Sequence, residues 1–107
     1  HITGGGFDGN IPRVLPRGVR ARINPAAWPR PGVYDWIQKC GELDESELLR
    51  VFNCGIGMVI VAPEEQTKDI CQRLEGLGER AYVIGTIERK KPDEAALLMD
   101  ASFRPPA

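Results

Sequence analysis

The longest apolar run in the chain, IGMVIVA at residues 56–62, most restricts the folds that the sequence can adopt. Apart from Gly57, every position carries an apolar side chain, and most of these side chains are β-branched. This pattern is typical of a strand whose two faces are both covered. The run is far too short to cross a bilayer as a helix. It therefore predicts a central strand, in a sheet that carries packed helices.

Shorter patterns on both sides of the run predict the other elements. Residues 19–23 alternate between apolar side chains and arginines, which indicates a half-buried strand. Apolar residues recur at helical spacing in two further stretches, which end at Gly41 and Gly78. The predicted helices are residues 10–15, 33–40, 45–52 and 64–77, and the predicted strands are residues 19–23, 56–62, 81–87 and 95–99.

Two side chains are predicted to cap helices. Asn10 precedes the first helix, where Pro12 falls in the first turn and its missing N–H costs nothing. Asp44 precedes the helix at 45–52, with Glu47 in the third helical position and Leu43 placed to pack as a hydrophobic staple.

The order of elements predicts the α+β class, with a mixed sheet and helices packed on it. With 107 residues the chain is one domain or part of one. Trp28 is expected to cover an apolar surface from a proline-rich loop, and residues 101–107 are expected to be a frayed tail.

Charge and cysteine content argue against several classes of function. The net charge is −1 and no basic stripe is present, so neither nucleic-acid binding nor membrane binding is predicted. Three cysteines form no CxxC pair and His1 is the single histidine, so no metal site and no disulfide framework is predicted. Free thiols in the reducing cytoplasm are the expected state.

Three consecutive glycines in HITGGGFDGN raise the possibility of an anion site in a predicted loop at residues 4–9. The spacing Gly4-x-Gly6-x-x-Gly9 matches a dinucleotide fingerprint, but the acidic residue about 20 positions further on is missing. The P-loop pattern fails, because Asn10 and not lysine follows the last glycine. Two interpretations stay open: a nest of backbone N–H groups that binds phosphate, and a turn that lets elements pack closely.

A second polar segment, FNCGIGM at residues 52–58, precedes the apolar run. Cys54 raises the question of a thiolate nucleophile, which needs a base or a cation beside it. Since His1 is the one histidine available, an inert thiol is the favoured interpretation.

Both glycine segments are similar to signatures of a known family. HITGGG continuing into NIPRVLP, and FNCGIGM after it, resemble the C-terminal domain of phosphoribosylformylglycinamidine cyclo-ligases, also called aminoimidazole ribonucleotide synthetases. Trp28, Val33, residues 36–37 and residues 81–85 fall at matching places. Gly9 stands where family members often have a glutamate. The resemblance covers nearly the whole chain and identifies residues 1–107 as the C-terminal part of this C-terminal domain. The domain is therefore expected to be incomplete here, with a distantly ferredoxin-like fold.

The resemblance implies a function for a longer protein. Family enzymes close formylglycinamidine ribonucleotide to aminoimidazole ribonucleotide in purine biosynthesis, with ATP and Mg²⁺ handled mainly by an N-terminal nucleotide-binding domain that these residues do not include. It also implies a homodimer for the full-length cytoplasmic enzyme. For this piece it implies no cofactor, no activity and possible self-association through an exposed sheet edge.

The resemblance also implies roles for particular residues. The expected substrate- or phosphate-binding residues are Thr3, Gly4, Gly5, Gly6 and Asn10. His1 is the candidate for proton transfer, and the supporting residues are Asn53 and Gly55. The alternative function is a free-standing, non-catalytic α+β module that binds a small ligand or a partner.

Overall fold

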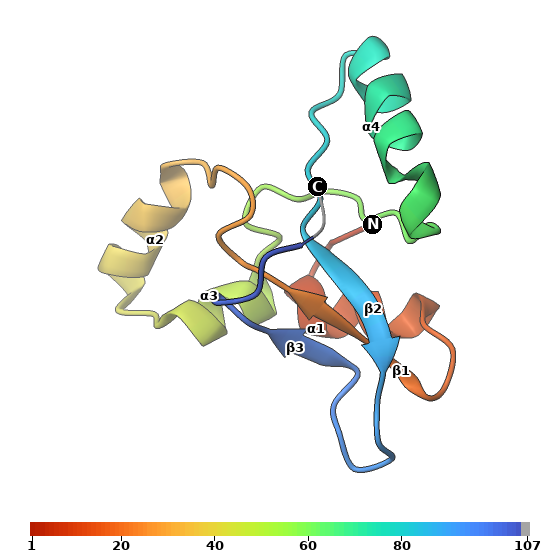
Figure 1. Cartoon of the computed structure of the whole chain (residues 1–107). Helices are drawn as coiled ribbons and strands as arrows, with labels where there is room; N and C mark the ends of the chain where they lie inside the picture. Colours follow the sequence, from red (N-terminus) through yellow and green to blue (C-terminus); the bar gives the residue numbers. More distant parts are fainter. Residues whose placement is uncertain (106–107) are drawn as a thin grey trace.

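The computed structural model describes residues 1–105, in which three strands form one mixed sheet (Figure 1). Strand β1 (Val19–Ile23) lies between β2 (Gly85–Arg89), which is antiparallel to it, and β3 (Leu97–Met99), which is parallel to it. The bounds of β1 are those that its alternation predicts. The α+β class and the mixed sheet are confirmed.

Short helices precede β1 and connect β1 to β2. They are α1 (Gly6–Asn10), the 3-10 helix η1 (Ile11–Val14), α2 (Val33–Gly41), α3 (Glu45–Val51), the 3-10 helix η2 (Glu64–Gln66) and α4 (Thr67–Gly76). Figure 1 shows α1 and α3 close to the sheet, whereas α2 and α4 project away from it on opposite sides. No described helix is long and apolar enough to cross a membrane.

The start of the chain differs from the prediction. The predicted loop at 4–9 is wrong, because α1 begins at Gly6, and the predicted helix at 10–15 is instead η1. Gly5 and Gly6 have φ angles of 93° and 58°, a left-handed conformation that lets the helix start one turn earlier. Asn10 does not cap a helix with its side chain, whereas Pro12 does lie in the first turn of η1.

The cap of α3 is confirmed. Asp44 Oδ1 accepts a hydrogen bond from the Glu47 N–H at 2.9 Å, and Leu43 packs against the buried cluster that contains Leu48. Helix α2 ends one residue later than expected, because Glu42 and not Gly41 adopts the left-handed conformation, with a φ of 53°.

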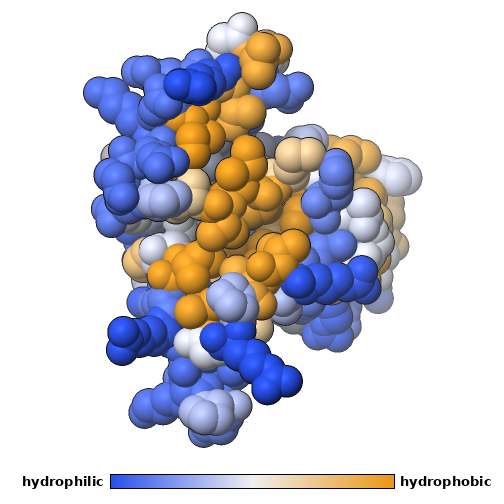
Figure 2. Space-filling model, turned by 90° about the vertical axis from the view of Figure 1, so that its right-hand side faces the viewer, coloured by the Kyte–Doolittle hydropathy of each residue, from blue (hydrophilic) through white to orange (hydrophobic). Residues whose placement is uncertain are grey.

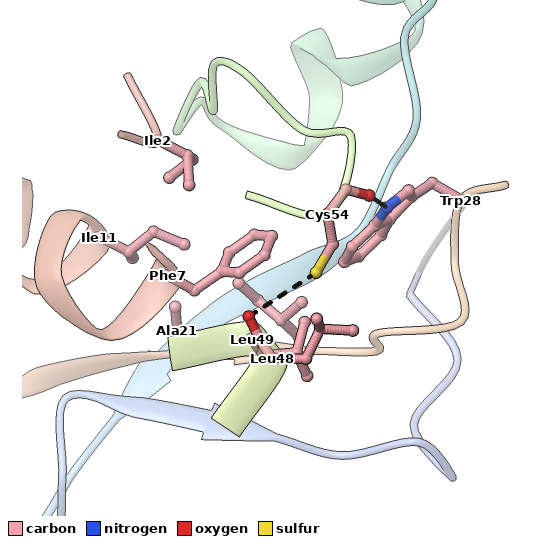
Figure 3. Packing of buried hydrophobic residues seen from close by; sticks show 9 residues of the cluster. Ile2, Phe7, Ile11, Ala21, Trp28, Leu48, Leu49 and Cys54 are labelled. Carbon is pink, nitrogen blue, oxygen red and sulfur yellow. Dashed lines mark hydrogen bonds between the residues drawn. The ribbon is translucent and has the colours of Figure 1, made fainter. Parts of the chain in front are cut away.

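The core lies between α1, α3 and the sheet (Figure 3). Phe7, Leu48 and Cys54 are its fully buried side chains. Trp28 is buried, as its place in the sequence predicts, with its ring 5.6 Å from that of Phe7. Its indole Nε1 donates a hydrogen bond to the Cys54 carbonyl at 3.0 Å, so the loop that carries Trp28 is fixed to the turn after α3.

The predicted central strand at 56–62 is wrong for the described residues. The segment belongs to neither a helix nor the sheet, and Met58, Ile60 and Val61 are more than half exposed. Its apolar pattern specifies burial, but a strand also requires a neighbouring backbone to pair with. Within residues 1–105, no strand pairs with it, and the one backbone hydrogen bond that it receives from a distant segment joins the Ile2 N–H to the Gly57 carbonyl.

The C-terminal half shows smaller corrections. The predicted strand at 81–87 begins only at Gly85, and the edge strand at 95–99 shortens to β3. The predicted helix at 64–77 opens as η2 and continues as α4. Helix α4 ends at Gly76, one residue before the predicted end. Gly78 follows it as the predicted stop, since its φ of 89° lets the Glu79 N–H reach the Leu74 carbonyl at 3.0 Å.

Charged residues fill the face of the sheet away from the core. Arg20 on β1 contacts Glu88 at 2.7 Å and Glu94 at 2.6 Å. Arg22 lies over the ring of Phe103, and Asn24 Nδ2 donates to the Phe103 carbonyl at 2.8 Å. Part of the segment predicted as a frayed tail thus contacts the sheet, and residues 106–107 of that segment lie outside the described residues.

Candidate functional site

The glycine-rich loop joins the buried Ile2 to α1. The Ile2 N–H donates to the Gly57 carbonyl at 2.8 Å, which places the loop next to the 52–58 segment. The Gly6 N–H turns back to the Thr3 carbonyl at 3.1 Å, and the Gly9 N–H bonds to the Gly5 carbonyl inside α1. Two of the donors expected in the anion nest are therefore already used.

Gly4 and Gly5 keep open donors. Both residues are exposed, and their N–H groups make no hydrogen bond to another residue of the described part. Gly4 also has nothing within 4 Å of the position that a Cβ would occupy. An anion can therefore approach the backbone here without displacing a side chain.

Asn10 holds the shape of this loop from inside. Its Nδ2 donates to the Gly6 carbonyl at 2.7 Å and lies 3.4 Å from the carbonyls of Thr3 and Gly4. Its Oδ1 accepts from the Thr3 hydroxyl at 3.2 Å. The hydrogen-bonding groups of both side chains are thus turned toward the loop itself, so the two residues position its backbone.

Gly6 has a packing role that the sequence left open. It is buried, and a Cβ at this position would lie 2.8 Å from the backbone carbon of Arg50 and would overlap the Leu49 carbonyl. Only glycine allows α1 and α3 to approach this closely at a left-handed φ. The close-packing interpretation therefore describes Gly6, whereas open donors remain at Gly4 and Gly5.

The 52–58 segment supports the loop through Asn53. Its Oδ1 accepts from the Gly55 N–H at 2.9 Å and from the Tyr34 hydroxyl at 3.0 Å, while its Nδ2 reaches the Ile2 carbonyl at 3.4 Å. Gly55 has a φ of 102°, and a Cβ there would lie 2.7 Å from Pro31 Cδ. Asn53 thus ties α2, the turn and the N-terminal segment together.

Tyr34 is a contact that sequence reasoning missed. Its pattern position on α2 indicates only a partly buried residue, and its partner Asn53 comes from a distant turn. No spacing rule links the two residues, because the contact exists only once α2 and the turn are packed.

Cys54 has the surroundings of an inert thiol. It is fully buried beneath Trp28 and Leu48, and its Sγ lies 4.0 Å from the Leu48 carbonyl. Burial raises the pKa of the Cys54 thiol, and the nearby Arg30 lowers it by less. Arg30 itself is held by Glu45 at 2.7 Å.

The remaining charged groups near the loop are exposed. His1 is exposed, and Asp8 on α1 lies 4.0 Å from Arg50 in a surface ion pair. Within residues 1–105, no three or more His, Cys, Asp or Glu side chains lie together in a way that could hold a metal ion. The described loop thus offers backbone donors but no cluster of acidic side chains.

Comparison with known proteins gives relatives over most of the chain. The family described as AIR synthase related protein, C-terminal domain, matches residues 1–97. The phosphoribosylformylglycinamidine cyclo-ligase of Syntrophus aciditrophicus is 45% identical over 91% of this chain and 28% of its own length. The protein of the same name from Citrifermentans bemidjiense is 51% identical over 83% of the chain and 26% of its own length, and that from Geotalea uraniireducens is 48% identical over the same shares. The chain therefore spans about a quarter of the length of these relatives.

Proposed function

The chain belongs to the family of AIR synthase related protein C-terminal domains, and on this premise we propose that it is part of a phosphoribosylformylglycinamidine cyclo-ligase. The observation that carries the proposal is the identity of 45–51% with proteins of that name, over 83–91% of the chain. Residues 1–107 then form part of the C-terminal domain of a longer enzyme, whose nucleotide-binding domain lies in the region that the chain does not span.

The proposed reaction of the whole enzyme is an ATP-dependent ring closure. ATP transfers its γ-phosphoryl group to the formyl amide oxygen of formylglycinamidine ribonucleotide and leaves as ADP. A nitrogen of the amidine attacks the activated carbon, the C–O bond to the phosphorylated oxygen breaks, and inorganic phosphate leaves with aminoimidazole ribonucleotide as the product. This chemistry depends on positioning and on donors that stabilise phosphate oxygens.

Within that enzyme, we assign phosphate binding to the glycine-rich loop. The open N–H groups of Gly4 and Gly5 are suited to a phosphate of the ribonucleotide or of ATP, and Gly6 permits the loop's close approach to α3. Thr3 and Asn10 hold the loop in shape through their mutual hydrogen bonds.

Three further residues belong to the same assignment. His1, exposed at the start of the loop, is the proposed group for proton transfer or phosphate contact. Asn53 and Gly55 support the loop through the contacts to Ile2 and Pro31.

The other parts of the proposal concern the whole protein. ATP and Mg²⁺ are assigned to the region of the full-length enzyme outside this chain. The full-length enzyme binds a ribonucleotide substrate and forms a homodimer. A cytoplasmic location is consistent with the free thiols of Cys40, Cys54 and Cys71.

The substitution Gly4→Ala in the full-length enzyme tests the phosphate site. A Cβ at Gly4 meets no protein atom, so the fold tolerates it, but it stands where the phosphate would approach the backbone. We expect KM for the ribonucleotide or for ATP to rise by about tenfold or more, the loss of one good charge-assisted hydrogen bond. The matched control is Gly76→Ala on α4, which also has open space around the added methyl group.

Two results would contradict the proposal at different levels. Unchanged kinetics in Gly4→Ala would remove the loop from the active site but leave the enzyme assignment intact. An unmutated full-length protein that forms no aminoimidazole ribonucleotide with ATP and Mg²⁺ would overturn the assignment itself and favour a non-catalytic binding module. A titration of the 107-residue chain with inorganic phosphate, followed by amide NMR, should shift the Gly4 and Gly5 signals.

A further inference from the structure

An apolar groove runs along the side of the molecule between α4 and the sheet. Its volume is about 420 Å³, and its walls are residues 58–62, residues 81–84, Ile70 and Leu74 of α4, and Ala21 and Ile23 of β1. Figure 2 shows the corresponding continuous band of hydrophobic residues, bordered by hydrophilic ones. A band of this kind on a folded chain marks a surface that another segment covers.

The backbone along the groove is unpaired as well as apolar. Among the described residues, no backbone hydrogen bond involves residues 58–62, and none involves residues 80–83. Neither segment belongs to a helix or a sheet, and the second runs directly into β2. Segments with unpaired N–H and C=O groups are templates for a further strand.

Helix α4 also lacks a neighbour that covers its apolar side. None of its residues is buried, although Ile70 and Leu74 line the groove as one apolar stripe. A helix gains most of its stability by packing such a stripe against a neighbour. The occupant must therefore touch the helix on one side and the two unpaired segments on the other, which requires apolar side chains on both of its faces.

The length of the relatives indicates where the occupant comes from. About three quarters of the relatives' polypeptide lies outside the region matched by this chain. Ile2 lies beside this surface, since its N–H bonds to the carbonyl of Gly57, next to residue 58. A second copy fits less well, because two copies related by a twofold axis would place groove against groove and leave the space unfilled.

We infer that an apolar strand from the part of the full-length polypeptide outside this chain fills the groove and pairs with residues 58–62. The strand gives residues 58–62 a backbone partner and gives α4 a surface to pack on. The inference rests on the part of the proposed function that makes this chain a piece of a longer protein, but not on the reaction. The tests therefore measure how well residues 58–62 are shielded from hydrogen exchange and from a thiol reagent, and they do not measure activity. The inference can then fail while the enzyme assignment stands.

Amide hydrogen exchange in the full-length protein and in the 107-residue chain is the first test. We expect the amides of residues 58–62 to exchange at least about 100-fold more slowly in the full-length protein, in the alternating pattern of a strand with one paired edge. Equal exchange in the two proteins would overturn the inference. Slower exchange in the 107-residue chain as its concentration rises would assign the groove to a second copy and would overturn it as well.

Thiol labelling at a single groove position is the second test. The background for this test is Cys40→Ser with Cys71→Ser, which removes the exposed thiol and the partly buried thiol that lines the groove. In this background, Val61→Cys and Val51→Cys place a thiol at two valines that are both 52% exposed, the first in the groove and the second on α3. In the 107-residue chain a maleimide should modify both at similar rates. In the full-length protein Val61→Cys should react at least about tenfold more slowly than in the short chain, and an unchanged rate would count against the strand.

Discussion

Gly4 and Gly6 stand two positions apart in one loop, yet they tolerate a side chain very differently. Gly6→Ala would press a methyl group into the backbone of Leu49 and Arg50 at a left-handed φ. We expect it to lower the free energy of unfolding by about 3 kcal/mol, the sum of overpacking and backbone strain. Gly4→Ala should stay within about 0.5 kcal/mol. Urea unfolding of the two variants measures both values, and equal stabilities would contradict the close packing of α1 on α3.

The cysteines give a second prediction for single residues. Cys40 is exposed, whereas Cys54 is fully buried and its thiol pKa is raised by burial. At neutral pH, iodoacetamide should therefore modify Cys40 readily and Cys54 only after unfolding in urea. Mass spectrometry of the labelled peptides distinguishes the two sites, and rapid labelling of Cys54 in the folded protein would mean that it is an accessible thiol.

At the scale of elements, the N-cap of α3 is a local interaction, and removing it should lower the free energy of unfolding without changing the rest of the fold. Asp44→Ala removes the acceptor of the Glu47 N–H and should lower the free energy of unfolding by about 1 kcal/mol. Ser46→Ala is the control, because its hydroxyl contacts only the Asp44 carboxylate, at 3.4 Å on the surface. Urea unfolding should show a clear loss for Asp44→Ala and almost none for Ser46→Ala.

The charged face of the sheet predicts a loss of stability in acid. The Lys91 N–H and Arg20 hold the pKa of Glu94 below its ordinary value of 4.5, and the Ser102 hydroxyl and N–H lower the pKa of Asp100. Because the folded-state pKa lies below the unfolded one, each carboxylate stabilises the fold above its unfolded pKa. This contribution is lost as the pH falls through the folded pKa.

Unfolding experiments between about pH 3 and pH 6 test this dependence. Glu94→Gln should flatten the decline in unfolding free energy toward low pH, because the variant has no proton to bind at that position. Glu79→Gln, an exposed carboxylate beyond α4, is the control and should leave the decline unchanged. A Glu94→Gln curve parallel to that of the parent protein would contradict the role of the carboxylate.

Elements with local determinants are those that the sequence predicts best. The alternation in β1 and the cap at Asp44 depend on neighbours in the chain, and both appear as predicted. The 56–62 strand and the start of α1 depend on distant contacts: a backbone partner for the first, and the fit of Gly6 against α3 for the second. In the candidate site, the loop and the turn were located from their motifs, but the Asn53–Tyr34 link and the inward-facing Asn10 arise only from packing.

At the scale of the whole molecule, the apolar groove predicts binding of a hydrophobic dye. The 107-residue chain should enhance the fluorescence of ANS, which reports exposed apolar surface. Ile60→Lys, at a position that is 51% exposed, should reduce this enhancement without unfolding the chain. Val51→Lys, with a similar exposed fraction on α3, is the control. Equal fluorescence in both variants and the parent would mean that the dye does not bind in the groove.

The strand order β2-β1-β3 has a consequence for how the polypeptide acquires its structure during synthesis. β1 leaves the ribosome before both of its hydrogen-bonding neighbours, which belong to the last quarter of the described residues. Until those residues emerge, the nascent chain holds Ala21 and Ile23 without a partner on either edge. Such long-range closure slows folding and gives chaperones a window in which to bind. A stop codon just before β3 would therefore leave one edge of β1 without a hydrogen-bonding strand, and the truncated product should be degraded by proteases faster than the longer chain.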